Sequence, residues 1–487
     1  MRTKKITILH SNDIHGDFLA EIKEGKGKLL GGLALLSGYI NKVREEEENV
    51  LYVVSGDMVQ GSLIDAEYKG ISTMEIMNYL SPDVAALGNH EFDYGLPHLL
   101  FLEKMANFPI VNANLYIKNY HKRLMRPHHI IPKAGLDILF TGIITEKVMD
   151  TLKLDPLIGS FVTLEEASQE VGKICDAYKR DDIDLTILLT HIGYESDVAL
   201  AKLLNPQWGV DIIIGGHSHT FLEEPTKENN VLIVQAGNGT NQIGRFDLTV
   251  DDDTNSVVDY QWKLLPIDDK LCKPDRKLEQ FIDSFKSDVD KKYSVVVTHF
   301  QKELTHPKRE EETTLGDLIA DIFAENTQAD VMLVGSGSIR VNQLGPVVSL
   351  KDLLACFPYD DSLVRHEITG KQLKTIFTHI MRSENLDGEG ECYQINSGVC
   401  ATYSEKGKKI SSLLVNGRVV EDESTYTVCM QGYHFKNSEA YLNLTKEELE
   451  TSGKSKTVTT SAQEVLKEYL MSHQNLSREI EGRLNFK

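Results

Sequence analysis

The stretch "IIIGGHSHTF", residues 212–221, places three isoleucines before two glycines and then two histidines, His217 and His219, one residue apart. Consecutive β-branched residues are typical of a buried strand, and the glycines that follow indicate its end. Side chains alternate along an extended backbone, so the two imidazoles point to the same side. The pattern predicts a buried strand whose end presents two neighbouring nitrogen ligands.

The same arrangement recurs along the first 265 residues, where apolar, β-rich runs alternate with helical stretches. Several runs finish on polar residues, as in "LHSNDIHG", "VVSGD", "LGNHE" and "LLTHIG". This alternation predicts an α/β domain, and ligands of open α/β sheets bind beyond the carboxyl ends of the strands. The expected strands are 6–10, 50–55, 84–87, 110–112, 138–141, 185–190, 211–215 and 232–235.

A chain of 487 residues is too long for one hydrophobic core. A charged segment with helical spacing separates two patterns, so we expect a first domain over 1–270, a linking helix over 271–298 and a second domain over 299–487. The second domain mixes helices, such as 311–325 and 462–472, with strands, such as 331–334 and 427–430. It is predicted to be a smaller α+β domain.

The net charge of −21 disfavours binding to nucleic-acid polymers or to anionic membranes. No apolar run reaches the length of about eighteen residues that a transmembrane helix needs. Polar residues from His10 to His15 interrupt the apolar start, so no signal peptide is expected. The six cysteines form no CxxC pair, which is typical of a reducing compartment, and we expect a cytoplasmic protein. The sequence specifies no oligomeric state.

The polar residues at the strand ends form one chemical set of carboxylates, imidazoles and an amide oxygen, without thiolates. Such a set suits divalent Mn, Zn, Co or Fe. Each residue alone has a structural alternative, such as a helix cap or a buried hydrogen-bonded histidine. Together they exceed the ligands of one ion, so two divalent ions are predicted. The candidate ligands are Asp13, His15, Asp57, Asn89, His191, His217 and His219.

The ordered motifs Asp-x-His, Gly-Asp, Gly-Asn-His-Glu, His and Gly-His-x-His resemble those of the calcineurin-like metallophosphoesterases. With "TTLGDLIADI" (313–322) and "GSGSIR" (335–340), nearly the whole chain resembles the 5′-nucleotidase family. The resemblance implies a two-sheet sandwich flanked by helices, followed by a smaller α+β domain that recognises the substrate. It also implies that a metal-bridging hydroxide attacks phosphorus and that phosphate leaves.

The family's ligand roles carry over to matching positions. By resemblance, Asp13, His15 and His219 would hold one ion, Asn89, His191 and His217 would hold the other, and Asp57 would bridge the two.

His90 and Asp93 are three residues apart, which is the spacing of one helical turn. The carboxylate can therefore hold the imidazole and favour its protonated form. The pair resembles the family's catalytic dyad, in which the histidine stabilises developing charge. The segment "HEFDY" also begins like a zinc-protease helix, but that motif needs histidine where this chain has Tyr94, so the protease interpretation fails.

Arg340, at the end of "GSGSIR", matches the arginine with which the family contacts substrate, although it could instead neutralise an acidic neighbour. Tyr393, Tyr433, His434 and Phe435 are candidate platforms for stacking a base, with core packing as the alternative. The Gly-Gly-Asp element that accompanies the family's second aromatic platform is missing from "QGYHFKNSEAY" (431–441).

These observations predict a phosphoric ester hydrolase whose small-molecule substrate is a nucleotide. Two alternatives use the same metals, namely a 2′,3′-cyclic nucleotide phosphodiesterase and a nucleotide-sugar hydrolase. A third, from another class, is a catalytically silent metal-binding scaffold, against which the complete ligand set argues.

Overall fold

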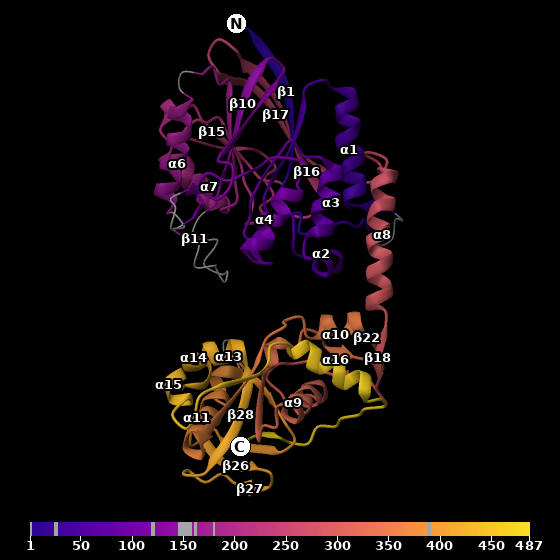
Figure 1. The fold of residues 1–487 in the computed structure, drawn as a ribbon, viewed down its shortest axis with the longest axis vertical. Helices are drawn as coiled ribbons and strands as arrows, with labels where there is room; N and C mark the ends of the chain where they lie inside the picture. The colour runs from indigo at the N-terminus through magenta and orange to yellow at the C-terminus, as the bar shows by residue number, and fades with distance from the viewer. Residues whose placement is uncertain are drawn as a thin grey trace. The chain divides into compact units, whose positions relative to one another are not determined.

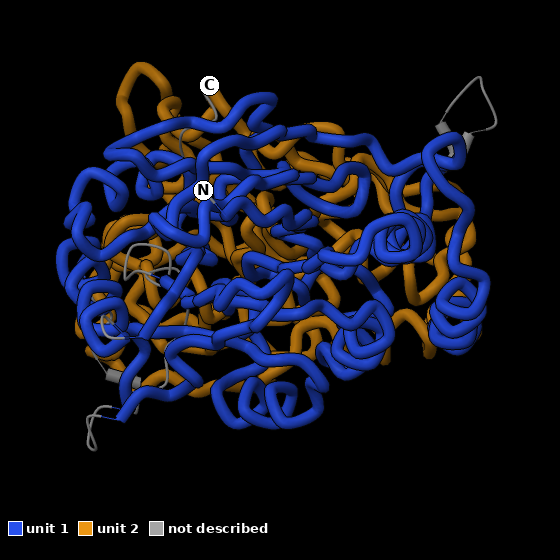
Figure 2. Tube along the Cα trace, turned by 90° about the horizontal axis from the view of Figure 1, so that it is seen from above, with its two compact units in different colours: residues 1–289 blue, residues 290–487 orange. Residues whose placement is uncertain are grey.

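A computed structural model of the chain describes residues 2–23, 28–117, 122–144, 158–159, 163–178, 181–386 and 391–487. The chain forms two compact units, residues 1–289 and 290–487, which Figure 2 distinguishes by colour.

The first unit contains two six-stranded sheets. In the first sheet four strands run parallel, from β1 to β6, and two long antiparallel strands, β16 and β17, continue it beyond β1. The order is β17 (Ser256–Pro266), β16 (Gln242–Asp251), β1 (Thr3–Ser11), β4 (Val50–Ser55), β5 (Val84–Ala86) and β6 (Ile110–Val111).

The second sheet has four parallel central strands, closed by an antiparallel strand at each edge. Its order is β14 (Thr226–Glu228), β15 (Val231–Val234), β13 (Ile212–Ile214), β12 (Leu185–Thr190), β10 (Leu136–Ile143) and β9 (His128–Lys133). The parallel strands of both sheets match those expected from the apolar runs, whereas the long strands β16 and β17 were not expected.

The two sheets face each other across one hydrophobic core, in which Ile8 and Val53 of the first sheet pack with Phe140, Ile187 and Ile214 of the second. Figure 1 shows helices on both outer sides, with α1 and α3 beside the first sheet and α6 and α7 beside the second. The helices are α1 (Leu33–Glu46), α2 (Leu63–Tyr68), α3 (Ile71–Leu80), α4 (Leu96–Met105), α6 (Leu164–Ala177) and α7 (Tyr194–Leu203). The expected sandwich flanked by helices is confirmed.

Short elements complete the first unit. They are β2 (Glu21–Lys23), β3 (Lys28–Leu30), β7 (Tyr116–Ile117), β8 (Lys122–Arg123), β11 (Ile158–Gly159) and the 3₁₀ turns η1 (His90–Phe92) and η2 (Pro206–Trp208).

The long helix α8 (Arg276–Tyr293) carries the chain from the first unit into the second. Two phenylalanines of this helix pack on the first unit, since Phe281 stacks with Tyr79 and Phe285 contacts the ring of Tyr68 edge to face. This attachment explains why the compact first unit ends within the helix.

The second unit is built on a five-stranded mixed sheet, with a four-stranded sheet beside it. The first has the order β24 (Tyr393–Ile395), β20 (Val331–Gly335), β28 (Thr425–Gln431), β23 (Leu363–Thr369) and β29 (Lys456–Thr459). The second has the order β27 (Arg418–Val419), β26 (Lys409–Val415), β25 (Val399–Ser404) and β30 (Leu484–Phe486). Two small pairs join β18 (Val296–His299) to β22 (Val347–Ser349) and β19 (Leu304–Thr305) to β21 (Gln343–Leu344).

Helix α11 (Gly370–Ile380) buries Leu373, Ile376 and Phe377 in a core shared with Leu333 and Leu413 of the two sheets. The other helices are α9 (Thr314–Thr327), η3 (Ser336–Ser338), α10 (Leu350–Cys356), α12 (Ser383–Leu386), α13 (Gly432–Lys436), α14 (Ser438–Leu442), α15 (Lys446–Leu449) and α16 (Ala462–Ser472). The mixture of strands and helices confirms the α+β expectation. Within the described ranges, no helix combines the length and the apolar character needed to cross a membrane.

Candidate metal centre and active site

The candidate ligands lie in the loops that leave five parallel strands at their carboxyl ends. Asp13 and His15 follow β1, Asp57 follows β4, Asn89 follows β5, His191 follows β12, and His217 and His219 follow β13. Both sheets contribute, because the carboxyl ends of their parallel strands meet at one edge of the sandwich.

The backbone at this edge is held in an uncommon conformation. Asp13, His15, Asp57, His217 and His219 all have positive φ angles, between 50° and 78°. Non-glycine residues rarely adopt this left-handed region, which costs about 1–3 kcal/mol per residue and is concentrated at functional sites. The surrounding fold therefore imposes a conformation that directs these side chains inward.

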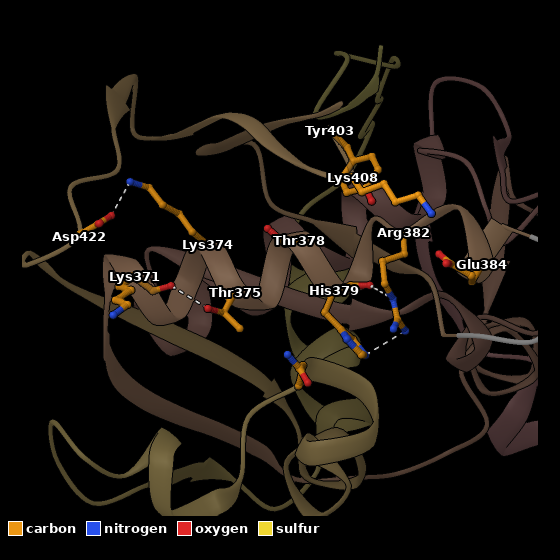
Figure 3. Close-up of a pocket in the computed structure, with 11 residues that line it drawn as sticks. Lys371, Lys374, Thr375, Thr378, His379, Arg382, Glu384, Tyr403, Lys408 and Asp422 are labelled. Atoms are coloured by element: carbon orange, nitrogen blue, oxygen red, sulfur yellow. Dashed lines mark hydrogen bonds and ion pairs between the residues drawn. The ribbon is translucent and has the colours of Figure 1, made fainter. Parts of the chain in front are cut away.

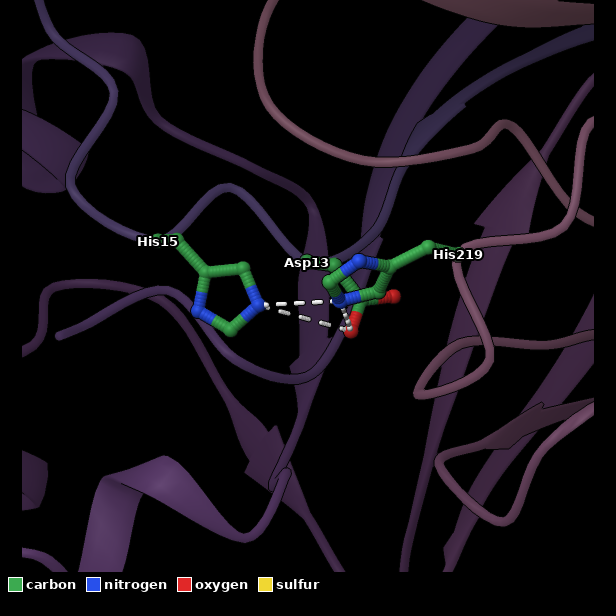
Figure 4. A group of neighbouring side chains, drawn as sticks. All are labelled: Asp13, His15 and His219. Carbon is green, nitrogen blue, oxygen red and sulfur yellow. Dashed lines mark hydrogen bonds and ion pairs between the residues drawn. The ribbon is translucent and has the colours of Figure 1, made fainter. Parts of the chain in front are cut away.

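Asp13, His15 and His219 form one group (Figure 4). The Nε2 atoms of the two histidines lie 3.2 Å apart, and they approach Oδ1 of Asp13 to 3.8 Å from His15 and 3.3 Å from His219. Asp13 is buried, whereas His219 is exposed. The carboxylate lies at the bottom of the site and the imidazoles at its open rim.

Asp57, His191 and His217 form a second group next to the first. Nε2 of His191 lies 3.0 Å from Oδ2 of Asp57 and 3.7 Å from Oδ1 of Asp13. Oδ1 of Asn89 lies 3.0 Å from Nδ1 of His217. Asp57 also lies 3.9 Å from His15, so its carboxylate is placed between the two groups.

The hydrogen bonds behind the rings show that these residues fit divalent cations. Nδ1 of His191 lies 2.9 Å from the carbonyl oxygen of Ser55, and Nδ1 of His15 lies 3.1 Å from that of Gln60. A carbonyl only accepts, so each Nδ1 carries a proton, and when the ring is neutral its Nε2 presents a lone pair. The Nε2 atom of His191 faces the carboxylates of Asp57 and Asp13, and that of His15 faces Asp13 and Nε2 of His219. These acceptors repel one another unless a proton or a metal ion lies between them.

The buried pair of Asp57 and His191 also requires positive charge between its two side chains. Burial disfavours a charged imidazole, but the adjacent Asp57 carboxylate outweighs burial and raises the pKa of His191 to about 10. Burial likewise disfavours the carboxylate, yet the charge of His191 lowers the pKa of Asp57. A proton held here competes with a metal ion, so metal binding to these residues releases protons.

His90 and Asp93 border the first group. They lie at the two ends of the 3₁₀ turn η1, in which residues three apart are eclipsed, and Nδ1 of His90 is 2.7 Å from Oδ2 of Asp93. This hydrogen bond raises the pKa of His90. The backbone N–H of His90 donates to Oδ1 of Asp57 at 2.9 Å, which fixes the turn relative to the ligands.

Glu91 is a residue of this site that the sequence analysis did not select. Its buried carboxylate accepts three backbone N–H groups, from Asp57 at 3.0 Å, Met58 at 2.7 Å and Gly88 at 2.6 Å. Burial and the charge of Asp57 raise its pKa to about 7. Glu91 thus ties the Asp57 loop to the Gly88 loop, a role that the polar segment "GNHEFD" (88–93) around it does not signal.

In the second unit, Arg340 follows η3 and is exposed, with its guanidinium 5.8 Å from the ring centre of Tyr359. Glu391 accepts the backbone N–H of Gly337 at 3.2 Å. Burial raises the pKa of Glu391, and the nearby charge of Arg309 partly offsets that effect. Arg309 was not selected from the sequence because it lies in a charged run, "KREEE" (308–312), that looks like solvated surface.

The structure buries two of the four candidate aromatic platforms and leaves one exposed. Tyr393 and His434 are 3% and 2% exposed, and Tyr393 belongs to the core of the second unit. Phe435 packs against that core and lies 4.7 Å from the ring of His366. Tyr393 and His434 are therefore placed as packing residues, and Phe435 is partly buried. The fourth candidate, Tyr433, is exposed, and its hydroxyl lies 3.0 Å from that of Tyr441.

Comparison with known proteins identifies relatives of both units. The family described as calcineurin-like phosphoesterase matches residues 6–221, and the family described as 5′-nucleotidase, C-terminal domain, matches residues 288–446. A 5′-nucleotidase of Vibrio cholerae is 28% identical over 96% of this chain and 90% of its own length.

Two solved structures share the fold over the whole chain. The 5′-nucleotidase precursor of Thermus thermophilus is 23% identical, with a TM-score of 0.66 and 99% coverage of both chains. The NAD nucleotidase of Haemophilus influenzae is 18% identical, with a TM-score of 0.60 and complete coverage of both chains.

Proposed function

The chain belongs to the 5′-nucleotidase family, in which a calcineurin-like phosphoesterase domain precedes a 5′-nucleotidase C-terminal domain, and from this premise we propose that it releases phosphate from nucleotides. It is a phosphoric ester hydrolase. The observation that carries the proposal is the convergence of lone pairs and carboxylates from five strand ends on one small volume.

Each group of side chains would hold one divalent cation. Asp13, His15 and His219 would hold the first, Asn89, His191 and His217 the second, and Asp57 would lie between them. When bound, two divalent cations stabilise charge on both the attacking and the leaving oxygens of a phosphoryl transfer and increase the acidity of water. We propose Mn²⁺, Zn²⁺, Co²⁺ or Fe²⁺, because the ligands are nitrogen and oxygen without sulfur.

His90 would act on the substrate directly. Asp93 occupies Nδ1 of the ring, so a protonated His90 has Nε2–H free to donate to a phosphoryl or leaving-group oxygen. The bond from its backbone N–H to Asp57 keeps the ring beside the ligand group. Asp93 would orient the ring and hold its proton.

In the second unit, Arg340 and Arg309 would supply positive charge to the substrate. A guanidinium recognises phosphate or a polar base edge through paired N–H donors. Since Tyr393 and His434 are buried, no stacking on these two rings is proposed, and selectivity for the nucleoside part would depend on exposed groups such as Tyr433. We further propose a cytoplasmic location, which the unpaired cysteines support.

A phosphate-release assay tests the function. The purified chain, loaded with Mn²⁺, is expected to release phosphate from a nucleoside monophosphate and to lose this activity on chelation. Parallel assays with a 2′,3′-cyclic nucleotide, a nucleotide sugar and ribose 5-phosphate, with products identified, separate the alternatives. A metal-loaded chain that hydrolyses none of these esters, with no phosphate, phosphomonoester or sugar phosphate formed, would support the silent scaffold instead.

A further inference from the structure

The second unit contains a cavity that has no part in the hydrolytic site. It has a volume of about 540 Å³ and is lined along one side by α11. Four of its lining residues are cationic, Lys371, Lys374, Arg382 and Lys408, and only Glu384 and Asp422 are acidic. A positively charged cavity is an exception in a chain with a net charge of −21.

Most of this positive charge is not neutralised by the protein. Lys374 pairs with Asp422 at 2.7 Å, at one end of the cavity (Figure 3). Within the described part of the chain, the ammonium groups of Lys371 and Lys408 have neither a hydrogen bond nor an ion pair. These two charges are therefore available to a ligand.

Arg382 is half-buried and has no carboxylate partner among the described residues. Its Nη2 lies 3.1 Å from Nε2 of His379, and that same ring nitrogen lies 3.1 Å from the carbonyl oxygen of Ala440. One ring nitrogen can either donate to Ala440 or accept from Arg382, but not both. Arg382 also donates to the carbonyl oxygen of His379 at 2.9 Å and to Oδ1 of Asn385 at 3.3 Å, and both acceptors are neutral. An anion would therefore supply the counter-charge that its described neighbours lack.

The position of the cations on α11 is unfavourable for the helix itself. Lys371 and Lys374 lie in its first two turns, and no acidic residue lies in the first turn. Positive side chains there oppose the helix dipole. The N-terminal N–H groups already have partners in the protein, since a capping box pairs Thr369 with Gln372 and the N–H groups of Gly370 and Lys371 donate to the carbonyl oxygens of Ser424 and Asp422. The ligand site is therefore the side-chain cavity rather than the helix end.

The length of the cationic row indicates the kind of anion. Lys371 lies near the start of α11 and Arg382 lies two residues beyond its end at Ile380. The helix has 11 residues, which at 1.5 Å per residue separates its two ends by about 16 Å. A single phosphate could reach only one or two of these groups. A chain of linked phosphates could contact several at once, with the hydroxyls of Thr378 and Tyr403 as further lining donors.

We propose that this cavity is a binding site for a small polyphosphate, either an inorganic one or a nucleotide carrying two or more phosphates. Binding here is separate from hydrolysis and does not depend on the metal-ligand residues.

The test measures binding directly, with inorganic tripolyphosphate as the probe and the full chain without added divalent metal. Hydrogen exchange followed by mass spectrometry is expected to show protection of the peptides covering 369–382 and 403–409. Lys371→Gln combined with Lys408→Gln removes two charges that have no protein partner, so the fold should be unaffected. The double variant is expected to lose about tenfold or more in affinity by calorimetry, since two charged hydrogen-bond donors to the phosphates are removed.

A charge-matched control changes Lys302→Gln and Lys467→Gln, two lysines outside the cavity that pair with Glu479 and Glu464. This control is expected to bind tripolyphosphate like the wild type, and both double variants should release phosphate from an aryl ester at the wild-type rate. Equal affinity in the cavity variant and the wild type would overturn the proposal. So would equal affinity for orthophosphate and tripolyphosphate, or binding of a hexaglutamate peptide without binding of tripolyphosphate.

Discussion

Replacement of Glu91 by glutamine tests whether metal binding depends on the hydrogen bonds by which Glu91 holds the loop of Asp57. The carboxylate holds the N–H groups of Asp57 and Gly88 on one oxygen and that of Met58 on the other. The amide oxygen of glutamine can keep the first two bonds, but its NH₂ group then faces the N–H of Met58. One buried donor is left without a partner, which costs about 1–3 kcal/mol.

The lost hydrogen bond destabilises the conformation of the loop that carries Asp57. A change in the groups that orient a metal ligand typically lowers metal affinity or activity about 10–100-fold. In Glu91→Gln we therefore expect the Mn²⁺ concentration for half-maximal phosphate release to rise by about that factor. Activity at saturating Mn²⁺ should largely return, because no predicted ligand and no substrate-contacting residue has been removed.

The assay is a Mn²⁺ titration of phosphate release, with thermal unfolding measured in parallel. Glu170→Gln is the matched control, since Glu170 is also buried and has three side-chain partners, Tyr116, Arg123 and Lys173. It should lose stability without changing the Mn²⁺ dependence. If Glu91→Gln kept the wild-type Mn²⁺ dependence, or shifted it no more than the control does, the reasoning would be refuted.

Four further outcomes are expected. Asp57→Asn should lose metal and phosphate release together, as measured by elemental analysis and by assay; two ions retained at full occupancy would contradict its place between them. His90→Asn should keep both ions but lower kcat by about 10²–10⁴-fold, the usual contribution of a general acid or base, and an unchanged kcat would remove His90 from the mechanism. Chelation should abolish activity and added Mn²⁺ should restore it, whereas full activity after chelation would exclude a metal-dependent reaction. Burial raises the pKa of Asp197 to about 8, above its ordinary value, so the folded protein holds an extra proton and the free energy of unfolding should fall as pH rises from about 4 to 8. Urea unfolding of Asp197→Asn should show a smaller fall in the free energy of unfolding over this pH range than the wild type. An equal fall in both proteins would contradict the prediction.

Local patterns were sufficient for the layout of the first unit. Apolar runs such as 50–55 and 185–190 form strands β4 and β12 with the same bounds, because a strand buried on both faces needs an uninterrupted apolar segment. The strands β16 and β17 were missed, since they carry polar residues on one face and lack such a run. Alternation of polar and apolar residues is a weaker indication of a strand than a continuous apolar run.

The metal-binding candidates were predictable for a topological reason. Parallel strands bring their carboxyl ends to one edge, so residues as distant as Asp13 and His219 meet once the strand order is set. The partners of Glu91 were not predictable, because they are backbone N–H groups of loops whose conformation depends on the whole edge.

From the sequence alone came the domain classes, the candidate metal ligands and the pairing of His90 with Asp93, which rest on short-range spacing and on motifs that resemble those of a known family. Only the tertiary structure decided that Tyr393 and His434 are buried and that Lys371, Lys408 and Arg382 line one cavity. Whether a ring is exposed, or a charge is left without a partner, depends on which surfaces pack together. Segments far apart in the chain determine that packing, and no local pattern encodes it.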